Sequence, residues 1–566
     1  MLWCVVVLAV VTVCRCEESE WKEVRTTQGV VRGRKDPDGV YAFYNIPYAT
    51  APTGPDRYKE PLPAPAWLKP RDAIDEKVVC MQGANPFMKD VNMKEDCLIA
   101  NVFVPETEGK NLPVMVYVHG GAFELGSGNM LPPKHFVREQ NVVAVTFNYR
   151  LGVQGFLCLG SKDAPGNAGM KDQVELLKWV KRNIARFGGN PDNVTILGAS
   201  AGSISVSLLM LSKSAQGLFT KVVPESGASV SSVSIQIDPL ENAKNYARML
   251  NFTDVDDFHA LEAFYKNTPL QSLVLSTFMD IKNVSLIYSP CVERQDKNAF
   301  LTDSPINIIK SGKYKKVPIL IGVSNMEGLL QIPNFERWKN DMNEKFSDFL
   351  PADLYFESEK EKEEVAQNVK EFYFNYKSVR DETILSYVDY FGDLYFAYPT
   401  LRTVKLHIEN GHDQIYLYEY SFVDENTPVV PYTDVQGATH CAQSMAIFDG
   451  DVLVTTDESK LTQEYKEMKA TMRKLWYNFA VHGKPVPEGS SLPAWPVTDA
   501  NGSPYMSLGK TLELRNSFLK TRAVLWDHLY QKYYREPVAP PPPPERHSEF
   551  NALLIFLNHY SLSAVE

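Results

Sequence analysis

A serine at position 200 is flanked by small residues in the pentapeptide Gly-Ala-Ser-Ala-Gly, residues 198–202. Residues 194–198 have the apolar character of a buried strand, and residues 203–212 have that of a helix. A tight turn from a strand into a helix needs small residues on both sides, and it exposes the serine hydroxyl at the carboxyl end of the sheet. This context predicts that Ser200 is a nucleophile, with a packed serine in a small-residue helix as the alternative.

A serine hydroxyl becomes a good nucleophile only when a base takes its proton and an acid orients that base. Hydrolases that use such a turn place the acid and then the histidine after the serine. His440 fits this order, because a glycine-containing loop presents it just ahead of an apolar helical run. The other histidines fit less well. His119 and His135 precede Ser200, and His547 and His559 lie in the C-terminal tail. Helical or charged surface patterns contain His259, His407 and His528, and apparent turns contain His412 and His482.

The acid candidate is Glu327, which stands directly before Gly328. The segment 317–330 has the pattern of a buried strand that breaks into a polar loop. A carboxylate at the carboxyl end of that strand would lie at the edge of the sheet where Ser200 emerges. The spacing makes Glu327 a candidate for the acid and His440 a candidate for the base, but it does not exclude other residues from either role.

The sequence His-Gly-Gly-Ala-Phe, residues 119–123, directly follows another apolar strand pattern. Acyl transfer needs backbone N–H groups aimed at the oxyanion that develops, and the loss of one such donor costs about 3–4 kcal/mol. Glycines after an early strand let the backbone approach that position. A simple Gly-Gly turn is the alternative.

The composition is that of a globular protein with a substantial core, since 44% of the 566 residues are hydrophobic and 22% are charged. The net charge of −11 argues against nucleic acid and acidic membranes as partners. Short apolar runs at 113–121 and 141–150 alternate with helical patterns such as 166–191. This alternation predicts an α/β fold with a large, mostly parallel central sheet flanked by helices.

The two ends of the chain differ from the middle. Residues 1–16 contain a short apolar run and are predicted to be a secretory signal peptide. Residues 17–535 are predicted to form a single catalytic domain. Residues 536–566 are predicted to be a proline-rich spacer followed by a short apolar tail, too short and interrupted for a stable membrane anchor.

Five cysteines follow the predicted signal peptide, and an odd number in a secreted chain leaves at least one free thiol. Cys80 and Cys97 enclose a short polar loop and are the pair chosen for a disulfide. No CxxC or Cys/His cluster indicates a metal site. Of the Asn-x-Ser/Thr sequons, those at Asn251 and Asn283 are predicted to carry glycan.

In these motifs the chain resembles the type-B carboxylesterases, a family of α/β-hydrolases that includes cholinesterases and secreted insect esterases. The match keeps its order and spacing over roughly residues 22–530. It includes the segments 29–34, 43–52, 95–105, 119–128, 148–157, 166–173, 187–202 and 322–328.

The resemblance implies a serine hydrolase that needs no cofactor. Ser200 would be the nucleophile, His440 the general base and Glu327 the acid that orients the base. It further implies that the N–H groups of Gly121, Ala122 and Ala201 bind the oxyanion. It also implies a supporting hydroxyl at Ser226 and a disulfide between Cys80 and Cys97.

The chain departs from the family pattern around the nucleophile. Ala199 stands where a glutamate is frequent, and the loop 80–97 contains Phe87 but no tryptophan. Both departures argue against choline esters. Ser324 replaces a usual asparagine near Glu327, and residues 441–448 read CAQSMAIF where the family usually carries an acidic residue and an aromatic one. The range of substrates therefore cannot be inherited from the family.

The sequence as a whole predicts a secreted serine carboxylesterase that hydrolyses small-molecule carboxylic esters through an acyl-enzyme. Two alternatives remain open at this point. One is a low-turnover protein that binds and scavenges esters, and the other is a non-catalytic binding module on the same fold. The oligomeric state is not determined by the sequence.

Overall fold

The computed structural model describes residues 21–37, 39–83, 90–275, 281–450 and 458–545. The predicted signal peptide, Phe87 and the last part of the predicted tail lie outside these ranges.

The described residues form a central sheet of 13 strands, in the order β1-β2-β3-β9-β11-β10-β12-β13-β14-β15-β16-β17 with β6 beside β2. All neighbouring strands from β11 to β16 are parallel. Beyond both ends of this run the neighbouring strands are antiparallel, except that β6 pairs with β2 in parallel. The strands are β1 Trp21–Arg25, β2 Val30–Lys35, β3 Val40–Pro47, β6 Arg71–Asp72, β9 Ile99–Pro105, β10 Leu112–Val118, β11 Val143–Phe147, β12 Gly189–Ala199, β13 Lys221–Glu225, β14 Ile319–Ser324, β15 Ile415–Tyr420, β16 Tyr505–Leu508 and β17 Leu512–Arg515.

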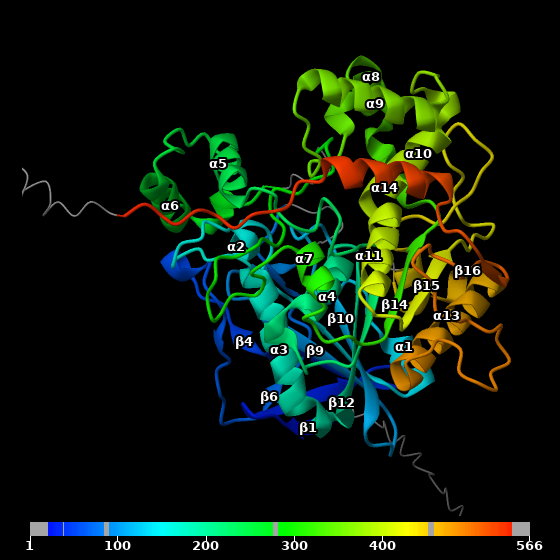
Figure 1. Ribbon diagram of the computed structural model, residues 1–566. Helices are drawn as coiled ribbons and strands as arrows, with labels where there is room; N and C mark the ends of the chain where they lie inside the picture. The colour runs from blue at the N-terminus through cyan, green and yellow to red at the C-terminus, as the bar shows by residue number, and fades with distance from the viewer. Residues whose placement is uncertain (1–20, 38, 84–89, 276–280, 451–457, 546–566) are drawn as a thin grey trace, which may run out of the picture.

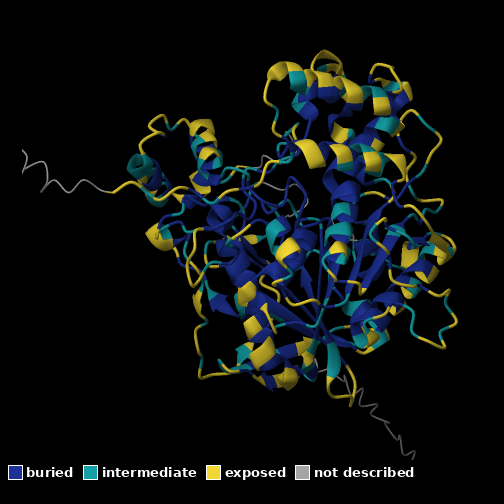
Figure 2. Ribbon diagram, viewed as in Figure 1, coloured by how far each residue is buried: buried dark blue, intermediate teal, exposed yellow. Residues whose placement is uncertain are grey.

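The central strands are continuous apolar runs because helices cover both faces of the sheet. The helices are α1 Lys134–Gln140, α2 Gly152–Phe156, α3 Ala168–Asn183, α4 Ala201–Leu211, α5 Pro239–Met249, α6 Phe258–Asn267, α7 Pro305–Ser311, α8 Phe335–Glu344, α9 Glu359–Phe374, α10 Ile384–Gly392, α11 Tyr398–Glu409, α12 Ala442–Ile447, α13 Gln463–His482 and α14 Thr521–Tyr533. Two hydrophobic clusters result, one containing the buried residues of α3 and α4 and the other those of α1 and α13. Figure 2 shows the buried sheet between exposed helix surfaces.

Helix α3 follows the predicted periodicity of segment 166–191. The six apolar residues at three- and four-residue steps are all buried: Met170, Val174, Leu177, Val180, Ile184 and Phe187. The last two lie in a 3-10 turn, Ile184–Phe187, that continues the helix. Gly188 ends it with a φ of 89°, a conformation that glycine adopts without strain.

A group of helices lies beyond the end of the sheet at which β14 leads into the predicted acid. This group contains α8, α9, α10 and α14, and α5 and α6 form a second group beside it (Figure 1). The segment after β14, Glu327–Asn334, packs directly against α10. The carboxyl ends of the central strands are therefore covered by helices, which is where a site enclosed from water would lie.

The proline-rich segment continues from α14 across the surface of the molecule (Figure 1). Its residues Pro537 and Pro540 are buried, and the N–H of Val538 donates a hydrogen bond to the carbonyl of Ile237 at 3.3 Å. The described part of the segment therefore packs on the domain. No helix in the described ranges combines the length and apolar character of a bilayer span.

Two disulfides cross-link the fold. Cys80 and Cys97, the pair chosen from the sequence, are joined. A second disulfide, which the sequence did not suggest, joins Cys158 to Cys291 across 133 residues. Cys441 is a buried free thiol.

Candidate active site

The serine turn is built as the small residues around it require. Ser200 lies between β12 and α4 with φ 57° and ψ −123°, a strained conformation for a residue with a side chain. A Cβ on Gly198 would lie 2.4 Å from the carbonyl oxygen of Gly202, and one on Gly202 would lie 2.0 Å from that of Val118. The turn is therefore possible only with glycine at both positions, and it presents Ser200 at the carboxyl end of the sheet.

Glu327 and His440 meet although 113 residues separate them. The Nδ1–H of His440 donates to Glu327 Oε2 at 2.5 Å, and the carboxylate side chain is 1% exposed. The opposite ring nitrogen of His440, Nε2, is buried and has no hydrogen-bond partner among the described residues. The histidine is thus oriented by an acid on one side and has a proton-accepting nitrogen on the other.

The carboxylate of Glu327 is held by a ring of hydrogen bonds. Its Oε1 accepts from the N–H of Ser324 at 2.7 Å and from the hydroxyl of Ser226. Gln443 closes the ring, because its Nε2 donates to Ser226 Oγ at 2.5 Å and its Oε1 accepts from Ser324 Oγ at 2.7 Å. Ser324, which replaces a usual asparagine of the family, and Gln443, which lies in the divergent segment 441–448, are therefore partners.

The ring of His440 stacks on Phe396, with centroids 4.1 Å apart and planes inclined by 24°. Phe396 belongs to a π-helical segment, Asp393–Ala397, between α10 and α11. Such bulges often occur at functional sites. Phe396 and Gln443 have no signature in the sequence, since only tertiary contacts distinguish them from ordinary core residues.

Strand β13 links the serine turn to the acid. The N–H of Ser200 donates to the carbonyl oxygen of Glu225 at 2.9 Å, and the next residue, Ser226, donates to Glu327. The Glu225 carboxyl accepts hydrogen bonds from Trp476 Nε1, at 2.8 Å, and from Ser444. Burial raises the pKa of Glu225 to about 7.

The glycine loop after β10 lies against the serine turn. A Cβ on Gly120 would lie 2.6 Å from the carbonyl oxygen of Ala199 and 3.0 Å from Ser200 Cβ. Gly121 and Ala122 have positive φ values of 111° and 55°. Within the described part of the chain, no acceptor takes a hydrogen bond from the N–H of either residue.

Ala201, the third predicted oxyanion donor, is the first residue of α4. N–H groups in the first turn of a helix have no partner within the helix and lie at the positive end of the helix dipole. The glycine loop and the first turn of α4 therefore both lie next to Ser200.

A sequence profile of the Carboxylesterase family matches residues 20–526. The chain belongs to the carboxylesterase family. It is 31% identical over 543 residues to Carboxylesterase 3B of Mus musculus, covering 91% of this chain and 92% of that protein. It is also 31% identical over 501 residues to Juvenile hormone esterase of Tribolium castaneum, covering 81% and 82%.

Solved structures agree with this assignment. The crystal structure of Juvenile hormone esterase from Manduca sexta, with OTFP covalently attached, superposes with a TM-score of 0.80 at 29% identity, covering 90% of this chain and all of that one. PNB esterase superposes with a TM-score of 0.71 at 27% identity, covering 89% and 99%. The predicted α/β-hydrolase fold and the predicted enzyme class are confirmed. The carboxylesterase is a carboxylic ester hydrolase and acts on small-molecule esters.

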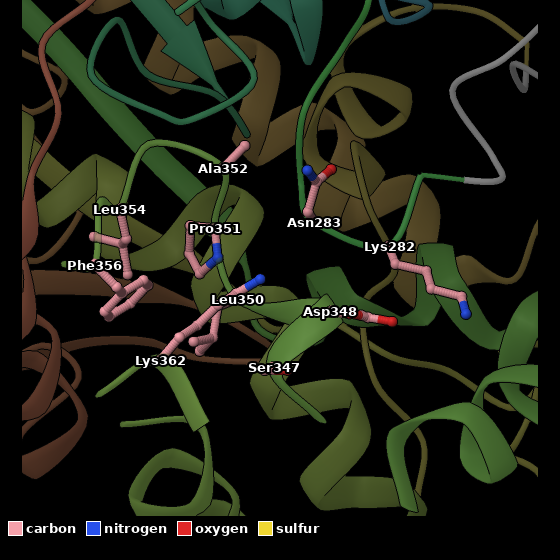
Figure 3. Close-up of a pocket in the computed structure, with 10 residues that line it drawn as sticks. All are labelled: Lys282, Asn283, Ser347, Asp348, Leu350, Pro351, Ala352, Leu354, Phe356 and Lys362. Atoms are coloured by element: carbon pink, nitrogen blue, oxygen red, sulfur yellow. The ribbon is translucent and has the colours of Figure 1, made fainter. Parts of the chain in front are cut away.

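One cavity in the described part of the carboxylesterase lies away from these residues (Figure 3). It has a volume of about 490 Å³ and is lined by Lys282, Asn283, Ser347, Asp348, Leu350, Pro351, Ala352, Leu354, Phe356 and Lys362. Asn283, a predicted glycosylation site, is exposed on its wall, and Asn251 is exposed at the end of α5. None of the predicted triad or oxyanion residues lines this cavity.

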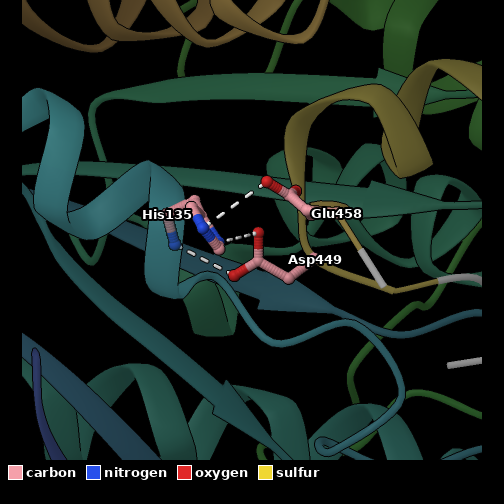
Figure 4. A group of neighbouring side chains, drawn as sticks. All are labelled: His135, Asp449 and Glu458. Atoms are coloured by element: carbon pink, nitrogen blue, oxygen red, sulfur yellow. Dashed lines mark hydrogen bonds and ion pairs between the residues drawn. The ribbon is translucent and has the colours of Figure 1, made fainter. Parts of the chain in front are cut away.

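One group of a histidine and two acids in the described residues is close enough to share a cation: His135, Asp449 and Glu458 (Figure 4). His135 Nδ1 bonds Asp449 Oδ1 at 2.9 Å, and this hydrogen bond raises the pKa of His135. Arg473 already pairs with both carboxylates, at 3.2 and 3.0 Å. The group therefore forms an ion-pair network that joins α1 to α13.

Proposed function

We propose that this carboxylesterase is secreted and hydrolyses esters through an acyl-enzyme on Ser200, with His440 as general base and Glu327 as the acid that orients it. The observation that carries the proposal is the bond of 2.5 Å from His440 Nδ1 to the buried Glu327, opposite an Nε2 that has no partner in the described part of the chain. This arrangement selects the ring tautomer whose Nε2 can accept a proton.

In acylation, Ser200 Oγ attacks the ester carbonyl carbon while His440 Nε2 accepts the hydroxyl proton. The carbonyl oxygen becomes an oxyanion, to which the N–H groups of Gly121, Ala122 and Ala201 donate. His440 then gives its proton to the leaving alcohol as the carbon–oxygen bond breaks. Water attacks the acyl-enzyme in the same way while His440 takes its proton. The bond between the acyl carbon and Ser200 Oγ then breaks, Oγ takes the proton back from His440, and the acid product is released. The cycle uses no cofactor.

Several features support secretion. Residues 1–16 have the pattern of a signal peptide. The two disulfides fit an oxidising compartment, because cytosolic thiols are kept reduced. We place the catalytic domain at 17–535 and the spacer and tail at 536–566, and we propose glycans on the exposed Asn251 and Asn283.

Pre-steady-state hydrolysis of p-nitrophenyl butyrate tests the proposed mechanism. The wild type should release a burst of one p-nitrophenol per active site, followed by steady turnover, and S200A should lose at least about 10⁴-fold in kcat. S207A is the matched control, since Ser207 lies in α4, the helix that follows Ser200, and its hydroxyl donates to the carbonyl of Ser203.

The other outcomes identify the alternatives. A burst that persists in S200A would refute Ser200 as the nucleophile. A full burst with almost no steady turnover would identify the low-turnover scavenging protein. A wild type that releases no p-nitrophenol, neither in a burst nor in steady turnover, would indicate a binding module in which these residues do not act on esters.

A further inference from the structure

His119 stands directly before the glycine loop and has no part in the proposed triad. Its side chain is buried, with 1% exposed, and its ring stacks on Tyr149 with centroids 4.4 Å apart and planes inclined by 21°. Its Nδ1 lies 2.8 Å from the carbonyl oxygen of Gly120. Because a carbonyl oxygen can only accept, Nδ1 must carry the proton and donate it.

This hydrogen bond acts on the peptide group that contains a proposed oxyanion donor. The carbonyl of Gly120 and the N–H of Gly121 belong to one planar peptide unit. In a trans peptide the C=O and the N–H point in opposite directions. A bond that fixes the direction of the Gly120 carbonyl therefore also fixes the direction of the Gly121 N–H.

We propose that His119 is a positioning residue for the oxyanion site: its Nδ1–H holds the Gly120–Gly121 peptide so that the Gly121 N–H points at the reacting carbonyl oxygen. This inference rests on the proposed function, since it assumes that the glycine loop binds the oxyanion beside Ser200. The inference adds to the proposed function a side chain that controls how well the glycine loop binds the oxyanion.

The loop needs such a restraint because its backbone is strained. Ala122 and Phe123 both have positive φ values, of 55° and 60°, which residues with side chains rarely adopt. Without a bond to its carbonyl, the Gly120–Gly121 peptide could rotate, since glycine permits many backbone conformations. A rotated peptide would present its oxygen, and not its N–H, to the developing negative charge.

A second layer of contacts holds His119 itself. The hydroxyl of Tyr149 donates to the carbonyl of His119 at 2.9 Å. A Cβ on Gly126 would lie 2.4 Å from His119 Nδ1 and 2.6 Å from the Gly120 oxygen. Gly126 thus packs against the hydrogen bond, and Gln82 anchors it through two bonds of 2.9 Å, one to its N–H and one to its carbonyl.

The ring is suited to a fixed role. Burial lowers the pKa of His119 to about 4, so the ring stays neutral at the pH at which esterases work. Its Nε2 has no hydrogen-bond partner among the described residues, which fits a neutral ring with its only proton on Nδ1. A neutral donor orients the peptide without placing a permanent charge beside the oxyanion.

The test compares His119→Asn, His119→Gln and His119→Leu. The amide nitrogen of asparagine occupies nearly the position of Nδ1 and can donate to the Gly120 carbonyl. Glutamine is also polar but its amide reaches the position of Nε2, and leucine has no donor. Comparing the two amides keeps the test informative even if the leucine variant fails to fold.

Three quantities are measured: kcat and KM for p-nitrophenyl butyrate, and Ki for an alkyl trifluoromethyl ketone. The p-nitrophenol burst gives the concentration of active sites from which kcat is calculated. Such ketones form a tetrahedral adduct with the serine and place an oxyanion in the proposed site. We expect H119Q and H119L to lose about 10- to 100-fold in kcat with little change in KM, and to raise Ki by the same factor. H119N should stay within about threefold of the wild type.

His407→Leu is the matched control. His407 is also buried, its Nδ1 bonds the hydroxyl of Tyr314 at 2.6 Å, and its Nε2 also lacks a partner in the described residues. H407L should lower the melting temperature. It should leave kcat, calculated per active site, and the Ki of the ketone unchanged.

The inference is overturned if H119Q keeps the kcat and ketone Ki of the wild type, or if H119N loses as much as H119Q. It is also overturned if H407L raises the ketone Ki as much as H119L does, because the effect would then be one of general stability. Failure of the proposed function is recognised separately, since it would appear as a burst that survives S200A.

Discussion

Glu225 offers a test of how the site is built, because it is a wholly buried carboxyl that is not a proposed catalytic group. Replacing it with glutamine keeps its shape. The amide oxygen can still accept from Trp476 Nε1, and the amide nitrogen can donate to the hydroxyl of Ser444, which can rotate to accept. The main change in E225Q is therefore the loss of a titrating group between the serine turn and α12.

The sign and size of the effect follow from the pKa. Burial raises the pKa of Glu225 from its ordinary value of 4.5 to about 7. Between these values the folded state binds more protons than the unfolded state, so the unfolding free energy of the wild type falls as the pH rises. The loss amounts to about 3 kcal/mol by pH 8. E225Q has no carboxyl at this position and cannot lose this stability. Its unfolding free energy relative to that of the wild type should therefore rise by about 3 kcal/mol from pH 4.5 to pH 8.

The measurement is the melting temperature of both proteins across this pH range. For a chain of this size, about 3 kcal/mol corresponds to a difference in melting temperature of about 3 °C. E108Q is the control, since Glu108 is exposed in the loop between β9 and β10, and its offset from the wild type should not depend on pH. An E225Q offset that stays constant between pH 4.5 and pH 8 would refute the reasoning.

Three further changes test the packing that positions the site. G202A should yield no folded protein, detected by circular dichroism, because its methyl group would lie 2.0 Å from a β10 carbonyl oxygen; a folded variant would contradict the turn geometry. D172N should destabilise the fold by about 3–5 kcal/mol, measured by urea denaturation, because it leaves the buried Arg150 charge without its carboxylate partner at 2.6 Å. The double variant C158S/C291S should lower stability by about 2–5 kcal/mol, and an unchanged melting temperature would show that this disulfide contributes nothing.

The sequence was informative wherever a local pattern determines the structure. The apolar strand, the glycines and the following helix predict the turn at Ser200, because no other backbone arrangement fits those residues so closely. Glu327 was a candidate for a similar reason, since it follows a buried strand whose carboxyl end lies at the same edge of the sheet. The periodicity of α3 likewise predicted its buried face.

The contacts that the sequence did not reveal join segments far apart in the chain. The disulfide between Cys158 and Cys291 depends on how two long segments pack, and no spacing encodes it. Gln443 resembles any polar residue in a helix until its partners on β13 and β14 are known. His407, in a pattern typical of a helical or charged surface, is in fact buried, because α11 packs against the core.

The hydrogen bonds around β13 give a physical reason why these distant residues act together. Strand β13 ends at Glu225, whose carbonyl oxygen accepts from Ser200, and the next residue, Ser226, donates to Glu327. Gln443 adds the segment after His440 to the same set of bonds. Because one strand end contacts the turn, the acid and the helix that follows the histidine, a displacement of any one of them strains the bonds to the other two. The geometry of the site therefore depends less on any single residue than on the packing of α12 against the carboxyl end of β13.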